Sequence, residues 1–136
     1  MNFVKIEMIN PINISGASFS DKVLHLIKKH NIPHTDNGNK TIDFYLYFQD
    51  KTIGLEAKGQ ETKGTVNEKL PHTIYKYLKL DIDEIWLVVH EHTLSDIIKE
   101  HIEVVSIDSN VVVRIVDITN LEDMFISNTP KVNEWF

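Results

Sequence analysis

The sequence predicts an α/β fold in which a mixed β-sheet is flanked by helices. Segments whose apolar residues recur at helical spacing are interspersed with alternating or continuous apolar runs that are typical of strands. Two strands follow one another directly at two points, so the order departs from a clean βαβ repeat and favours a mixed sheet. The 136 residues contain no internal repeat or Pro/Gly-rich linker, so residues 1–136 are expected to form one domain.

The first 40 residues predict one helix between two less regular stretches. Residues 1–17 show no clear periodicity, although three apolar residues alternate there as in an edge strand: Val4, Ile6 and Met8. The helix is expected at about 19–31, where apolar residues recur at i, i+4, i+7 and i+8, and Ser18 with Asp21 has capping-box spacing. The segment PHTDNGNK that follows (33–40) is rich in turn-forming residues and is expected to be a loop.

Two strands of a β-hairpin are expected next. TIDFYLYF (41–48) alternates between apolar and polar residues, and GLEAKG (54–59) follows after a turn at 49–51. If Asp43 lies opposite Glu56, the apolar residues of both strands fall together on the core side of the sheet. These residues are Ile42, Phe44, Leu46, Phe48, Ile53, Leu55 and Ala57.

The rest of the chain predicts helices interspersed with strands. A helix is expected at 65–80, or only from Pro71 onward, because proline is tolerated in the first turn of a helix. EIWLVVH (84–90) predicts a buried strand, and a helix capped by Thr93 is expected to run to about residue 102. Its inward residues are expected to be Leu94, Ile97, Ile98 and Ile102. The remaining elements are strands at 104–107 and 111–116, a turn between them at 108–110, and a short helix at about 120–126.

Composition excludes several classes of function. The chain has no cysteine, which rules out disulfides, thiol catalysis and thiolate metal sites, and a reducing cytoplasmic compartment is expected. We find no secretory signal and no apolar run long enough for a membrane span. The net charge of −6 argues against nucleic acid, but residues 1–80 carry +3 and residues 81–136 carry −9. A basic surface must therefore come mainly from the first 80 residues.

Three charged residues in the predicted hairpin carry the chemistry. Glu56 and Lys58 are two apart and point to one side of their strand, and Asp43 joins them if it lies opposite either. Opposed β-carbons lie about 4.5–5.5 Å apart, where two carboxylates repel and a divalent cation stabilises them. A neighbouring lysine can orient an attacking water and offset charge on phosphate. This combination points to metal-assisted phosphodiester hydrolysis; the alternative is an ordinary cross-strand ion pair between Asp43 and Lys58.

The string TIDFYLYFQDKTIGLEAKGQ (41–60) resembles the core of the PD-(D/E)xK nuclease superfamily, which has a restriction-endonuclease-like fold. That family has a strand bearing Asp, a second strand bearing Glu-x-Lys, and then a helix. Asp43 matches the first acid, Glu56 the second and Lys58 the lysine. One departure is Ile42, which stands where the family usually has a proline. The similarity extends over roughly residues 18–90.

The resemblance implies a set of site residues and a cofactor. Asp43 and Glu56 would bind magnesium (Mg²⁺), with Mn²⁺ as a substitute, and the carbonyl of Ala57 is a further candidate ligand. Gln60 matches a glutamine that lies near the site in some members. Family members often carry an acid on the helix before the hairpin. Asp21 is the only acid on that helix, so it is the candidate for a second-metal or water-mediated ligand.

The expected partner is DNA. The candidate phosphate-binding residues follow the predicted catalytic lysine and lie mostly on one helical side: Lys63, Lys69, His72, Lys76 and Lys79. We therefore expect a Mg²⁺-dependent DNA endonuclease of the restriction-like type that leaves a 5′-phosphate and acts as a homodimer or with a partner subunit. A Holliday-junction or repair nuclease, an RNA nuclease, and a non-catalytic nucleic-acid- or protein-binding domain on the same fold are the alternatives.

Overall fold

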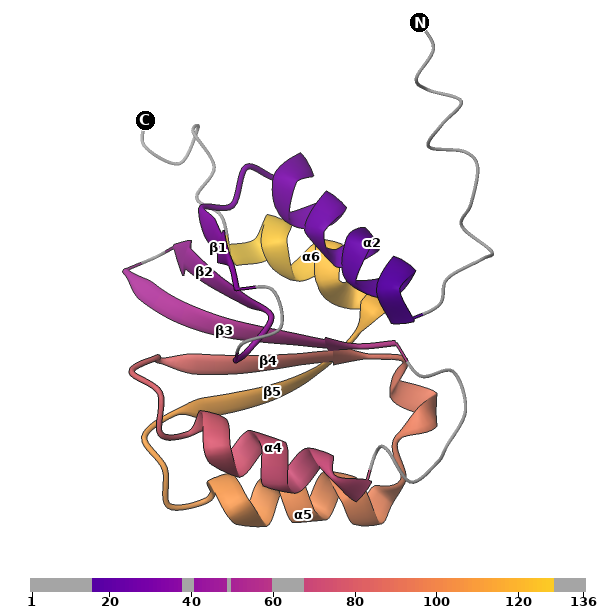
Figure 1. Cartoon of the computed structure of the whole chain (residues 1–136), viewed down its shortest axis with the longest axis vertical. Helices are drawn as coiled ribbons and strands as arrows, with labels where there is room; N and C mark the ends of the chain where they lie inside the picture. The colour runs from indigo at the N-terminus through magenta and orange to yellow at the C-terminus, as the bar shows by residue number, and fades with distance from the viewer. Residues whose placement is uncertain (1–15, 38–40, 49, 60–67, 129–136) are drawn as a thin grey trace, which may run out of the picture.

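A computed structural model describes residues 16–37, 41–48, 50–59 and 68–128 of the chain, and it contains a five-stranded mixed sheet with helices on both faces (Figure 1). This confirms the predicted α/β class. The strands are β1 (His34–Asp36), β2 (Phe44–Phe48), β3 (Lys51–Lys58), β4 (Glu84–Val89) and β5 (Val112–Asp117). The helices are α2 (Gly16–Lys29), α4 (Leu70–Tyr77), α5 (Asp96–Ser106) and α6 (Ile118–Asn128), with a 3₁₀ turn, η1 (Glu91–Thr93).

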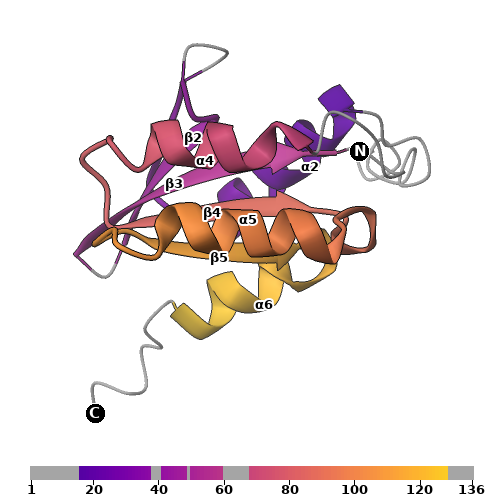
Figure 2. The same cartoon turned by 90° about the horizontal axis from the view of Figure 1, so that it is seen from below.

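The strands lie in the order β1-β2-β3-β4-β5. β1, β2 and β3 pair antiparallel, whereas β3, β4 and β5 pair parallel. Parallel neighbours need a crossover, and α4 and α5 provide the two crossovers on the same face of the sheet. Figure 2 shows these two helices side by side, while α2 and α6 cover the opposite face. None of the helices in the described ranges is both long and apolar enough for a membrane span.

Two apolar clusters hold the layers together. Phe19 of α2 and Phe125 of α6 pack with Trp86 on one face of the sheet, and the Trp86 and Phe125 rings stack at 6.1 Å. Ile74 of α4 and Ile98 of α5 pack on the other face. Because both faces are covered, β4 is buried along its whole length, as expected for the near-continuous apolar run EIWLVV.

The register of the hairpin is the predicted one, because Phe44 pairs with Leu55 and Leu46 with Ile53. The expectation that Ile42 shares their side of the sheet is wrong. Ile42 belongs to the cluster beneath α4, on the opposite face. Residues 41–43 form a bend before β2, and Gly54 leaves room on that face for the Ile42 side chain. The side chain of Phe48 lies outside the described residues, as do residues 1–15 with the alternating Val4, Ile6 and Met8.

Two predicted elements before or at α4 differ in the structure. The predicted loop at 33–40 contains β1, which pairs with β2 as the outer strand of the sheet. β1 is only three residues long and largely exposed, so it has no apolar alternation to reveal it. In the described part of the helix predicted at 65–80, α4 spans Leu70–Tyr77 with Pro71 in its first turn, close to the later of the two expected starts; residues 65–67 lie outside the described residues.

Three assignments after β4 are wrong. Thr93 lies in η1, and the cap of α5 is Ser95, whose Oγ accepts the backbone N–H of Ile98 at 3.2 Å. Ile97 is 62% exposed, although Leu94, Ile98 and Ile102 are buried as expected. The predicted strand at 104–107 is the last turn and cap of α5, because the apolar face of this helix continues to Val105. The predictions of β5 and of a last helix are confirmed, with α6 longer than expected.

The close approach of Ile42 to Gly54 generates a test of the bend. A Cβ at residue 54 would lie 2.6 Å from Ile42 Cδ1, so Gly54→Ala should lower the free energy of unfolding by about 1–3 kcal/mol through overpacking. Ile42→Val removes that Cδ1 atom. In urea unfolding, the double variant should therefore lose less stability than the two single losses together. Strictly additive losses would show that Ile42 does not pack on Gly54.

Candidate active site

The two acids predicted to form the site lie side by side where β2 begins. Asp43 immediately precedes β2, and Glu56 lies in β3. The backbone N–H of Asp43 donates to Glu56 Oε1 at 3.2 Å, and the backbone N–H of Ala57 donates to Asp43 Oδ2 at 2.9 Å. Each acid therefore accepts a backbone hydrogen bond from the segment that carries the other. Asn37 holds the same bend, because its backbone N–H donates to the Asp43 carbonyl and its Nδ2 to the Ile42 carbonyl, both at 3.0 Å.

Lys58 completes the predicted trio. Its Nζ lies 3.2 Å from Glu56 Oε2. The Glu56 side chain is only 5% exposed, whereas that of Lys58 is 37% exposed. Asp43 is intermediate in burial. The cluster therefore opens to solvent on the side of Lys58 and Asp43, and a ligand would approach from there.

Burial sets the electrostatics of the acid pair. It raises the pKa of Asp43, against the Ala57 N–H and the Lys58 charge, and the nearby Asp36 carboxylate raises this pKa further. Burial also raises the pKa of Glu56, and the Asp43 charge adds to the increase while Lys58 opposes it. Both acids are thus costly to ionise without a further positive charge.

The other buried acid of the sheet differs in this respect. Glu84 of β4 accepts hydrogen bonds from Trp86 Nε1 at 2.9 Å, Lys51 Nζ at 2.9 Å and Arg114 Nε at 3.1 Å. Burial alone would raise the pKa of Glu84, but these three donors outweigh it and lower the pKa. Glu84 is neutralised by the protein itself, whereas Asp43 and Glu56 share one lysine.

The donor set of the acid pair suits a hard divalent cation. Mg²⁺ binds through one or two carboxylates and completes its coordination with water and phosphate oxygens. Two adjacent carboxylates with raised pKa values match this requirement. Within the described ranges, no group of three or more histidines and acids is placed to hold a metal ion. Any protein ligation by the described acids at this position would therefore rest on the pair Asp43 and Glu56.

Two residues near the acid pair were missed at the sequence level. Asp36 was assigned to a loop, but it pairs with Phe44 in β1 and its charge acts on Asp43. Tyr77 is not singled out within the expected helix, but its hydroxyl group donates to the Thr41 carbonyl at 3.5 Å, and the Glu56 charge contributes to the raised pKa of Tyr77. No sequence signal identifies Asp36, whereas helical spacing with Leu70 and Ile74 indicates that Tyr77 faces the sheet.

The remaining residues suggested by the resemblance stay predictions. Asp21 is exposed on α2, and the buried residues of α2 pack on the face of the sheet opposite to that covered by α4. The Ala57 N–H is engaged with Asp43, and its carbonyl remains a candidate ligand. Gln60 and Lys63 lie outside the described residues.

The predicted phosphate-binding residues that the structure describes lie on or beside α4. The helix buries Leu70, Pro71 and Ile74 against the sheet. The four basic residues are exposed: Lys69, His72, Lys76 and Lys79. Lys79 Nζ lies 4.9 Å from the ring centre of Tyr75. We call these four residues the α4 basic stripe. Tyr77 is the last residue of the same helix.

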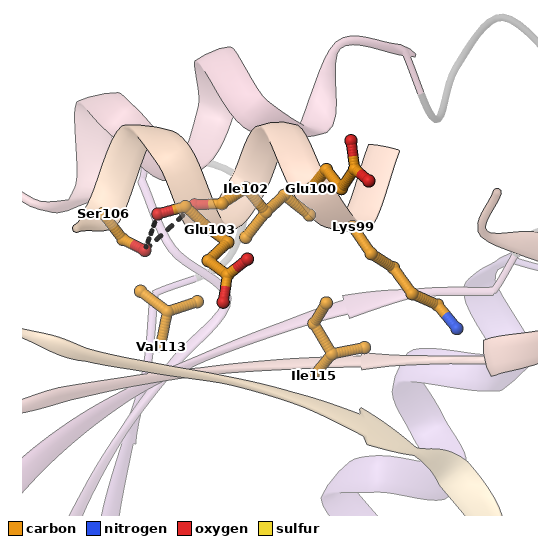
Figure 3. Close-up of a pocket in the computed structure, with 7 residues that line it drawn as sticks. All are labelled: Lys99, Glu100, Ile102, Glu103, Ser106, Val113 and Ile115. Carbon is orange, nitrogen blue, oxygen red and sulfur yellow. Dashed lines mark hydrogen bonds between the residues drawn. The ribbon is translucent and has the colours of Figure 1, made fainter. Parts of the chain in front are cut away.

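A groove between α5 and β5 lies elsewhere on the molecule (Figure 3). Its volume is about 340 Å³, and Val113 and Ile115 point from β5 toward the helix. Glu100 and Glu103 line it with Lys99, and it contains none of the residues predicted to act in catalysis. β5 is also two strands away from β3, so this groove is separate from the acid pair.

Comparison with known proteins agrees with this arrangement. Residues 35–128 match the sequence profile of a PD-(D/E)XK nuclease superfamily domain. No curated protein is significantly similar to the chain. The matched region spans more than half of the chain and includes β2, β3, Asp43, Glu56 and Lys58. The chain therefore belongs to the PD-(D/E)XK nuclease superfamily.

Proposed function

We propose that the protein is a Mg²⁺-dependent DNA endonuclease of the restriction-like type. The observation that carries this proposal is the convergence of Asp43, Glu56 and Lys58, with both acids raised in pKa and the lysine at the open side. The family is one of nucleases, and a pair of carboxylates beside a lysine suits metal-assisted attack on a phosphodiester.

Each residue has a distinct role in the proposed reaction. Asp43 and Glu56 bind the cation, and a bound Mg²⁺ supplies charge neutralisation and polarisation of the phosphate. Lys58, 3.2 Å from Glu56 and partly exposed, orients the attacking water and offsets negative charge on the phosphate. Gln60 and Asp21 support the site, and the product carries a 5′-phosphate.

The α4 basic stripe is the proposed contact with the nucleic-acid backbone. Lysine contacts to phosphate release counterions, so binding through such a surface weakens with salt. The stripe offsets locally the chain's net charge of −6, which is concentrated in residues 81–136. DNA is the proposed substrate, and RNA is the alternative that parallel assays on both nucleic acids would detect.

The proposed assembly is a homodimer or a catalytic subunit with a partner. A single site cuts one strand, so a double-strand cutter needs two sites. A Holliday-junction or repair nuclease that recognises structure is the alternative within the same chemistry.

A non-catalytic nucleic-acid- or protein-binding domain is the second candidate. The low exposure of Glu56 and the acidic net charge favour it. Titration with Mn²⁺ separates the candidates, because a catalytic site must bind the cation through Asp43 and Glu56.

Removal of the lysine tests the mechanism. On a supercoiled plasmid with Mg²⁺ or Mn²⁺, the parent should give nicked or linear product. Lys58→Ala should slow cleavage by about a hundredfold or more, because a group that orients water and stabilises charge is lost. Lys99→Ala is the matched control, since Lys99 of α5 pairs with Glu91 of η1. Equal rates for the parent and Lys58→Ala would refute the assignment.

The raised pKa of Glu56 predicts how stability depends on pH and metal. A carboxyl group with a raised folded-state pKa stabilises the fold while protonated, and this contribution is lost as pH rises through that pKa. At pH 7 without metal, Glu56→Gln should therefore raise the melting temperature by roughly 4 °C, or about 1 kcal/mol. Thermal unfolding from pH 4 to 8 in a chelator measures this, with the exposed Glu103→Gln as control.

The same variants test metal binding. Mn²⁺ should raise the melting temperature of the parent and of Glu103→Gln, because it binds only the folded state, but not that of Glu56→Gln. A Glu56→Gln protein that still responds to Mn²⁺ as the parent does would exclude Glu56 as a ligand.

The α4 basic stripe makes a further prediction. Lys69→Ala combined with Lys76→Ala should weaken DNA binding for all sequences and lower the slope of log affinity against log salt by about 2. Fluorescence anisotropy at several salt concentrations measures both effects. Lys29→Ala is the control, because Lys29 pairs with Glu122 between α2 and α6. An unchanged salt slope would show that α4 does not contact phosphate.

A further inference from the structure

The ring of Tyr75 is exposed on the outer side of α4, where it takes little part in packing. Tyr75 is 47% exposed, whereas the neighbouring Ile74 is fully buried. Among the described side chains, one other Phe, Tyr or Trp is exposed, and this is Tyr47 of β2. The Tyr47 hydroxyl group forms a hydrogen bond with Thr35 Oγ1 at 2.9 Å. The Tyr75 ring lies in a different setting, because its neighbours are charged.

This ring lies within the α4 basic stripe. Residues three or four positions apart are neighbours on a helix, so Tyr75 lies between His72 and Lys79. The contact is direct, because Lys79 Nζ lies 4.9 Å from the centre of the Tyr75 ring. Residues 69–80 contain three lysines and one histidine but no Asp or Glu, in a chain whose net charge is −6. Positive charge and exposed aromatic surface therefore occur together on one side of α4.

The same surface lies next to the acid pair. Alternate residues of β3 pack beneath α2, so Glu56 and Lys58 point to the opposite face of the sheet, which α4 covers (Figure 1). At the end of α4, the Tyr77 hydroxyl group donates to the Thr41 carbonyl, two residues before Asp43. A nucleic-acid strand bound along α4 would therefore lead toward the acid pair.

An exposed ring among lysines suits unpaired nucleotides better than a duplex. Proteins that bind single strands combine cationic groups along the backbone with aromatic side chains on which bases stack. In a duplex the bases stack on one another, so an exposed ring on a protein surface gains little from them. Lysines alone would serve either form, because phosphate contacts do not depend on base pairing. The Tyr75 ring is therefore the feature of this surface that favours an unpaired strand.

We propose that Tyr75 stacks on an unpaired base, so that the α4 basic stripe holds a single-stranded segment of DNA beside the acid pair. The substrate class is thus DNA with unpaired nucleotides next to the bond that is cut, as in a fork or a bubble. Lys76 and Lys79 contact the phosphates next to the stacked base. The inference rests on the proposed function in that the α4 basic stripe contacts DNA, and it adds a preference that fully paired DNA does not satisfy.

Tyr75→Ala tests the stacking. Alanine has a higher helix propensity than tyrosine, so α4 should form in this variant, and thermal unfolding checks that it does. Fluorescence anisotropy in a chelator, with a labelled single strand of DNA and a blunt duplex of the same length, measures binding without cleavage. Tyr75→Ala should bind the single strand about tenfold more weakly and the duplex as tightly as the parent does.

Two further variants serve as controls for this measurement. Tyr75→Phe keeps the ring and should bind both forms of DNA as the parent does. Tyr47→Ala removes an exposed ring from β2 and should also bind as the parent does. Parental affinity of Tyr75→Ala for the single strand, or equal weakening for single strand and duplex, would overturn the proposal. Tyr75→Phe binding as weakly as Tyr75→Ala would also overturn it, because the contact would then be made by the hydroxyl group.

Cleavage assays separate this inference from the proposed function. With Mg²⁺ or Mn²⁺, the parent should cut a forked duplex about tenfold faster than a fully paired duplex, and Tyr75→Ala should lose this preference. A parent that cuts the two equally fast, or prefers the paired duplex, would overturn the inference and leave the proposed function intact. A parent that binds single strands through Tyr75 but cuts neither substrate would refute the proposed function and support the stacking surface.

Discussion

The rest of the site depends on the pair of hydrogen bonds that joins Asp43 to β3. The Asp43 carboxylate accepts the Ala57 N–H, and the Asp43 N–H donates to Glu56. These bonds place two like charges next to each other in a largely buried position, which is unfavourable unless a cation is present. They also accompany the bend at 41–43, through which Ile42 reaches the opposite face and packs over Gly54. The bend at 41–43 therefore determines both how Ile42 packs and where Asp43 lies.

The two buried acids of the sheet, Glu84 and Glu56, are the same residue type in two different electrostatic environments. Glu84 joins β3, β4 and β5 through Lys51, Trp86 and Arg114, and its negative charge is balanced within the protein. Glu56 is at least as deeply buried as Glu84, but it has a neighbouring acid and one partly exposed lysine. Two adjacent buried carboxyl groups with too little positive charge around them, in a sheet that is otherwise well packed on both faces, are typical of functional sites.

Much of the hairpin could be predicted from the sequence, because the alternation of apolar residues requires a register in which the two strands share one apolar face, and the observed register of this kind also brings Asp43 and Glu56 together. The position of Ile42 could not be predicted, since it depends on space left by a glycine in the partner strand. β1 could not be predicted because a short exposed strand has no periodic pattern of apolar residues. The β-branched residues among 104–107 favour extended structure, whereas packing of Val105 against the core extends α5 through this segment. The hydroxyl contact of Tyr77 depends on how α4 docks, which local pattern does not encode.

The residues of the candidate site come from a compact stretch of the described sequence. Asp43, Glu56, Lys58 and the charged or backbone groups that act on them lie between Asp36 and Lys58, and the basic stripe lies on and beside α4. β5, α5 and α6 contribute packing and carry much of the negative charge. Substitutions on the exposed faces of α5 and α6 would therefore leave the hydrogen bonds of the acid pair unchanged, since those bonds are made within residues 37–58.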